Sequence, residues 1–80
     1  MTVIELAQIL DLFYNEGLKR KESNAFVQMF GIRYAKEISD SNVDVKDIIE
    51  KSTLKESYSS EIYKGIKLSK YVDFKEDILF

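Results

Sequence analysis

Residues 45–72 read VKDIIEKSTLKESYSSEIYKGIKLSKYV, and they have the outline of a helix-turn-helix. The first part predicts a short helix with Asp44 as its N-cap and an end near Ser52. A connection follows over residues 53–56. After it, a longer helix is expected over about residues 58–71, with Ser57 as its cap.

Three apolar positions in this stretch have the spacing that a helix-turn-helix requires. Ile48 lies in the first helix, Leu54 in the turn, and Ile62 in the second helix eight residues later. The motif also prefers a small residue in the first helix and glycine at the entry to the turn, where this chain has Ile49 and Thr53. We therefore expect a turn that is longer or more open than in the standard motif.

The predicted second helix has a polar face rich in lysine and hydroxyl groups. At 100° per residue its inner face gathers Ile62, Ile66, Tyr58, Gly65 and Ser69, and Glu61 lies to one side. The opposite arc carries Ser59, Ser60, Tyr63, Lys64, Lys67, Lys70 and Tyr71. Lysines neutralise phosphates, and serines near a helix N-terminus bond phosphates or base edges, so this face suits DNA. A three-lysine face is also common on helices that contact only solvent.

The N-terminal part of the chain predicts a helix with two apolar faces. Thr2 and Glu5 have the spacing of a capping box, and Gly17 is interpreted as the stop of a helix over residues 3–15. Ile4 and Leu12 fall outside the main apolar face. They indicate either a helix sandwiched within the fold or a contact surface for a second copy.

A second helical stretch begins at Ser23 and is predicted to break in two. In one unbroken helix Arg33 and Glu37 would lie in the middle of the apolar face, so we place a change of direction at Gly31 and a shorter helix to about Ser39. A polar loop over residues 39–42 follows. The whole chain is then mainly α, with four to five short helices.

The tail has two apolar runs, residues 71–74 and 78–80, around a charged turn. They predict a short β-hairpin with Lys75 at its tip, which would make the domain winged-helix-like. The alternative is a C-terminal strand and anchor that closes the core. Its apolar residues are Val72, Phe74, Ile78, Leu79 and Phe80.

Composition narrows the class of protein. Eighty residues suit a single domain, residues 1–80, and the absence of cysteine excludes a disulfide framework. Histidine is also absent, no phosphate-binding glycine loop is present, and no acidic cluster has metal-ligand spacing, so we expect neither an enzyme nor a cofactor or small-molecule site. No apolar run is long enough to cross a membrane, and the cytoplasm is the expected location.

The segments at residues 30–35, 57–62 and 64–72 also resemble small bacterial helix-turn-helix-like domains. They read FGIRYA, SYSSEI and KGIKLSKYV. The resemblance covers most of the chain, up to Val72, and implies a bacterial or phage origin and a binding role. It transfers no established ligand or catalytic residue.

Two functional hypotheses follow. The first is a dimeric DNA-binding module, such as a small transcriptional regulator, in which Lys64 and Lys67 contact phosphates and Lys70 belongs to the same DNA-binding face. In it, Ser59, Ser60 and Tyr63 approach the bases. The second is a protein-interaction domain of the same fold that binds a protein partner through the flank of the first helix, at Ile4 and Leu12, or through the apolar C-terminus, and the acidic pI of 5.1 favours it. Both hypotheses allow a homodimer.

Overall fold

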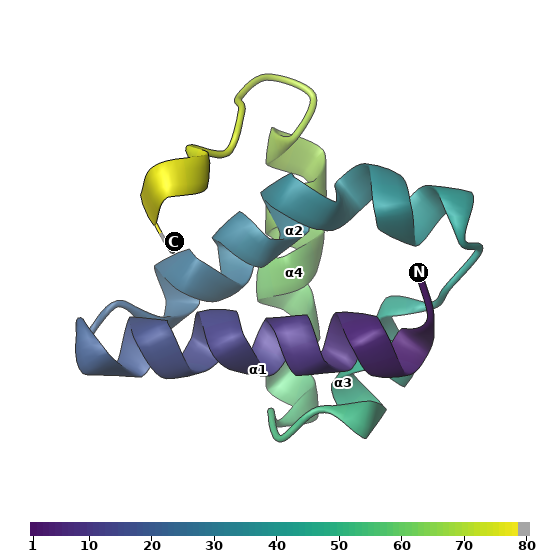
Figure 1. The fold of residues 1–80 in the computed structure, drawn as a ribbon, viewed down its shortest axis with the longest axis horizontal. Coiled ribbons are helices and arrows are strands. Elements are labelled where there is room, and N and C mark those ends of the chain that lie inside the picture. The colour runs from purple at the N-terminus through teal and green to yellow at the C-terminus, as the bar shows by residue number, and fades with distance from the viewer. Residues whose placement is uncertain (79–80) are drawn as a thin grey trace.

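The computed structural model describes residues 1–78, and this part of the chain is helical with no strand. The α-helices are α1 (Val3–Lys19), α2 (Ser23–Asp40), α3 (Val45–Lys51) and α4 (Ser59–Leu68) (Figure 1). Two 3-10 turns, η1 (Glu56–Tyr58) and η2 (Glu76–Ile78), complete the described elements. The mainly α class and the helical pair at α3 and α4 are confirmed. None of the described helices is long and apolar enough to cross a membrane.

Helix α1 begins as predicted and ends later. The Thr2 side chain accepts a hydrogen bond from the Glu5 backbone, and the Glu5 carboxylate accepts one from the Thr2 backbone, which completes the capping box. The prediction that Gly17 stops the helix is wrong. A Cβ on Gly17 would lie 2.8 Å from the Ser23 Cα and 2.9 Å from the Phe26 Cβ, so this glycine lets α1 and α2 approach closely. The left-handed residue of the turn is Lys21, with φ of 58°.

Helix α2 is continuous through Gly31, so the predicted break there is also wrong. The prediction rested on Arg33 and Glu37, whose charges conflicted with a buried face. In the structure both side chains are half-exposed, and the Arg33 guanidinium lies 3.3 Å from the Glu37 carboxylate and 2.7 Å from that of Glu76. The long arginine side chain thus keeps its charge at the surface, and the helix needs no break.

Gly31 instead marks the place where α2 and α4 cross. A Cβ on Gly31 would collide with the carbonyl oxygen of Ile62, and a Cβ on Gly65 would collide with that of Gln28. The two helices therefore touch backbone to backbone, and their interface is the most extensive between the described helices. This crossing fixes the position of α4.

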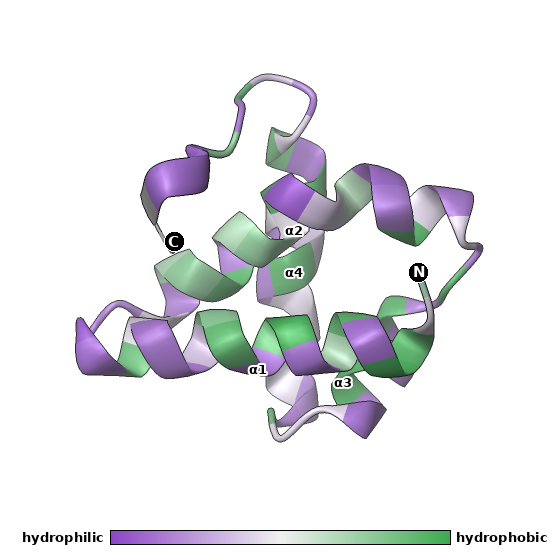
Figure 2. Ribbon diagram, viewed as in Figure 1, coloured by the Kyte–Doolittle hydropathy of each residue, from purple (hydrophilic) through white to green (hydrophobic). Residues whose placement is uncertain are grey.

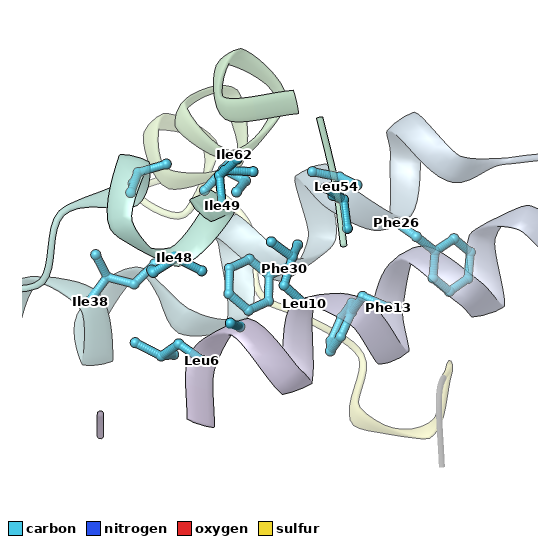
Figure 3. Packing of buried hydrophobic residues seen from close by; sticks show 13 residues of the cluster. Leu6, Leu10, Phe13, Phe26, Phe30, Ile38, Ile48, Ile49, Leu54 and Ile62 are labelled. Carbon is cyan, nitrogen blue, oxygen red and sulfur yellow. The ribbon is translucent and has the colours of Figure 1, made fainter. Parts of the chain in front are cut away.

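One hydrophobic core joins all four helices. Figure 3 shows side chains from α1, α2, α3, the α3–α4 connection and α4 meeting at the centre. Three phenylalanines are among its largest fully buried members, and Phe13 and Phe30 meet edge to face with ring centroids 5.9 Å apart. In Figure 2 hydrophobic residues concentrate along α1 and near the centres of α2 and α4, whereas the connections are mostly hydrophilic. The core thus packs α1 and α4 on α2, and α3 against α1 and α4.

Residues 71–78 contain no strand, so the described part of the tail supports neither the predicted hairpin nor a winged fold. Residues 72–75 are irregular and η2 follows them. The alternative of an anchor is correct for Phe74, whose ring packs on Phe13 at 5.6 Å, and wrong for Val72, which is exposed. The burial expected for the side chains of residues 78–80 lies outside the described part of the structure.

Candidate nucleic-acid interface

The connection between α3 and α4 is longer than a tight helix-turn-helix turn, as the missing small residues predict. Residues 52–58 separate the helices and include η1. The Ser52 hydroxyl donates to the carbonyl of Ile49 at 2.7 Å and accepts from the backbone of Leu54 at 3.1 Å. The backbone N–H and the hydroxyl of Thr53 both donate to the Asp11 carboxylate of α1, at 2.9 and 2.8 Å. These bonds fix an open turn in one conformation.

The inner face of α4 holds this helix rigidly against the core. Ile62 is fully buried, Gly65 lies at the crossing with α2, and Ile48 and Leu54 are buried beside it, so all three predicted motif positions face the core. Just before α4, the Tyr58 ring meets Tyr14 edge to face at 5.2 Å. A hydrogen bond between these two phenols raises the pKa of Tyr14 above its ordinary value. The N-terminal end and the middle of α4 are thereby tied to α1 and α2.

The outer face of α4 presents most of the residues that the sequence suggested for DNA. Ser60, Tyr63, Lys64 and Lys67 are exposed and lie on consecutive turns of one side of the helix. Tyr63 is 49% exposed. The side is basic and polar, and it faces away from the crossing with α2.

Two of the suggested residues are placed differently from the prediction. Helix α4 ends at Leu68 rather than Tyr71, so Lys70 lies in the turn that follows the helix, although it is exposed. Ser59 is half-buried, and Ser57 does not cap the helix because it lies within η1; the N-cap is Tyr58. The Ser60 hydroxyl donates to the Ser57 carbonyl at 3.1 Å. Lys64 and Lys67 are thus the lysines that α4 itself positions.

Glu61 restrains one of these lysines. Its carboxylate accepts a hydrogen bond from the Gln28 amide at 2.6 Å and from the Lys64 ammonium at 3.1 Å. These two hydrogen bonds hold the pKa of Glu61 below its ordinary value, and the bond from Gln28 has the larger effect. Lys64 is 62% exposed in its side chain, so its ion pair is open to solvent and to competition from another anion.

Sequence reasoning missed the Gln28–Glu61 bond and the role of the two glycines. Gly31 and Gly65 both lie inside helices, where glycine costs about 1 kcal/mol relative to alanine. An interior helical glycine therefore usually has a packing reason. The presence of two costly glycines inside helices was therefore the sequence signal for a close helix crossing. Nothing in the sequence pairs Gln28 with Glu61.

The fold and this face define a helix-turn-helix-like domain. The sequence model of a family described as "HTH-like domain" matches residues 2–75. The chain belongs to this family, which agrees with the resemblance seen in the sequence. No curated protein and no solved structure matches the chain.

Proposed function

We propose that this protein binds double-stranded DNA through the outer face of α4 and acts as a small regulator of transcription. The observation that carries the proposal is the placement of Lys64, Lys67 and Tyr63. They lie on the exposed side of the second helix of a helix-turn-helix-like pair, the position from which this class of fold enters a major groove. The backbone crossing at Gly65 keeps that helix fixed relative to the core.

The electrostatics limit how the protein would bind. The chain carries 14 acidic and 12 basic residues, so its net charge of -2 does not favour nonspecific wrapping of DNA. Contact would depend on a few local lysines, with Lys64 and Lys67 on phosphates and Lys70 at the edge of the site. Ser60 and Tyr63 lie on the same face and would approach the bases.

The test is a fluorescence-anisotropy titration with mixed-sequence duplex DNA at two salt concentrations. Each phosphate contact costs about 3.5-fold in affinity between roughly 50 and 200 mM salt, so three lysines give a loss of about 40-fold. In the variant Lys64→Ala/Lys67→Ala this loss should shrink to about 3.5-fold, with weaker binding to every sequence.

A charge-matched control is Lys36→Ala/Lys46→Ala, which removes exposed lysines from α2 and α3. It should bind nearly as tightly as the wild type. Equal effects of the two double variants, or no effect of the α4 variant, would refute the assignment of the face.

A second candidate function is recognition of a protein by the C-terminal end of α4 and the residues that follow it. Leu68, Tyr71 and Val72 are exposed next to the lysines, and Tyr71 is 82% exposed. Exposed apolar side chains of this kind are typical of protein contacts. The acidic pI of 5.1 also favours this candidate. A lack of DNA binding at the lower salt concentration would favour it over DNA.

A further inference from the structure

Two tyrosine rings at the outer side of α4 take no part in the packing of the fold. Tyr63 and Tyr71 are both exposed, and among residues 1–78 neither ring contacts another ring, a guanidinium or a hydrogen-bond partner. The other described tyrosines and phenylalanines all pack against a ring or an arginine. These two rings are therefore available to a ligand.

The two rings lie in one row along the outer face. Tyr63, Lys67 and Tyr71 follow each other at intervals of four residues, which places them on one side of a helix. Although α4 ends at Leu68, the backbone N–H groups of Tyr71 and Val72 donate to the Leu68 carbonyl at 2.9 and 3.1 Å, so the helical turn continues. In Figure 1 this end of α4 projects beyond α2. Eight residues place the rings about 12 Å apart along the helix axis.

Positive charge borders this row. The exposed cations next to the rings are Lys64, Lys67 and Lys70. Two acids lie nearby. The Glu61 carboxylate already binds Gln28 and Lys64, and Asp73 lines a small cavity together with Arg33 on the side of the tail. The charge between the two rings is therefore that of the lysines, and it is complementary to phosphates.

The chemistry of the row fits the faces of unpaired bases. In a duplex the grooves offer only the edges of the base pairs, because each face is covered by its neighbour. Exposed aromatic rings within a basic surface are instead typical of sites for single strands, where bases stack on the rings. The rings are farther apart than the roughly 3.4 Å between stacked bases, so they would take bases that are not stacked on each other. Lysine is depleted at protein interfaces, so a protein partner fits this row less well.

We propose that the outer face of α4 also binds single-stranded DNA, with Tyr63 and Tyr71 each stacking on an unpaired base. The three lysines neutralise phosphates of the same strand. This inference rests on the proposed function in that the same face contacts DNA. It adds Tyr71, which duplex binding leaves outside the contact.

Fluorescence anisotropy at low salt tests the proposal with two labelled strands of about 12 nucleotides, a length within the usual site sizes. One is oligo-thymidine, which does not pair with itself, and the other is an abasic strand with the same phosphates. Two stacked bases contribute roughly fivefold or more each, so the thymidine strand should bind roughly 25-fold tighter than the abasic strand.

Variants separate the ring from the rest of the surface. Tyr71→Ala should weaken binding of the thymidine strand roughly fivefold or more and leave binding of the abasic strand and of duplex DNA nearly unchanged. Tyr71→Phe keeps the ring and should bind like the wild type. The matched control is Leu68→Ala, which removes an exposed apolar side chain without a ring and should also bind like the wild type. Circular dichroism confirms that each variant is folded.

The outcomes distinguish this inference from duplex binding. Equal affinity for the two strands, no effect of Tyr71→Ala, or an equal loss in Tyr71→Phe or Leu68→Ala would overturn stacking and leave duplex binding intact. Binding of the thymidine strand without binding of the duplex would support stacking and contradict the proposed function. No binding of either strand or of the duplex would overturn both.

Discussion

Replacing Gly65 with alanine perturbs the crossing of α2 and α4 directly. The new Cβ would collide with the carbonyl oxygen of Gln28 and lie 3.0 Å from the Cα of Gly31. Because both neighbours are backbone, no side-chain rotation relieves the contact and α4 must move away from α2. Such overpacking costs about 3 kcal/mol, the upper part of its usual range, and the better helix propensity of alanine offsets about 1 kcal/mol. The free energy of unfolding should fall by about 2 kcal/mol.

Urea unfolding followed by circular dichroism at the helix band measures this change. With a denaturant dependence of about 1 kcal/mol per M, the midpoint should fall by about 2 M. The control Ser60→Ala lies on the outer side of the same helix and should change stability by less than about 0.5 kcal/mol. In the double variant with Gly31→Ala the two costs should add incompletely, because the first substitution already separates the helices. A Gly65→Ala variant with the same free energy of unfolding as the wild type would refute the close crossing of α2 and α4.

Three further changes test other contacts. Thr2→Ala removes the N-cap of α1 and should lower the free energy of unfolding by about 1 kcal/mol in urea. Phe74→Ala removes the half-buried ring of the tail and should lower it by about 1 kcal/mol; no change would show that the tail does not anchor. Glu61→Gln leaves Lys64 without its acid and should raise DNA affinity roughly threefold at low salt, whereas unchanged affinity would mean that the ion pair does not compete with phosphate. The pKa of Glu61 is depressed in the folded protein, so the hydrogen bonds of its ionised carboxylate stabilise the fold at pH values above its ordinary pKa of 4.5. This stabilisation is lost as the pH falls. The Glu61→Gln variant should therefore lose less stability in acid than the wild type.

Local signals in the sequence predicted the parts of the fold that depend on local chemistry. The capping box at Thr2, the N-cap at Asp44 and the apolar spacing of Ile48, Leu54 and Ile62 each rest on neighbouring residues, and the structure confirms them. The exposed lysines of α4 follow from the same periodicity. Helix ends were less accurate because Gly17 serves a contact between helices rather than a turn.

The errors concern contacts between segments far apart in the sequence. Gly31 was interpreted by its local tendency to end a helix, but its partner at the crossing is Gly65, 34 residues later. The sequence pattern makes the charge of Arg33 unfavourable on α2, but in the structure its guanidinium pairs with Glu76 of the tail, 43 residues later. The tail has the apolar runs of a strand, yet its described residues form none, and the Phe74 ring packs on Phe13 instead. Such pairings require the three-dimensional structure.

A titration of isotope-labelled protein with duplex DNA, followed by two-dimensional nitrogen–proton NMR, locates the contact surface most directly. If α4 contacts DNA, the largest shifts should fall on the amides of Ser60, Tyr63, Lys64 and Lys67 and decrease as salt is added. The signal of the Leu12 amide, which lies on α1, should shift little. Shifts concentrated on α1, or no shifts at low salt, would contradict DNA binding by α4.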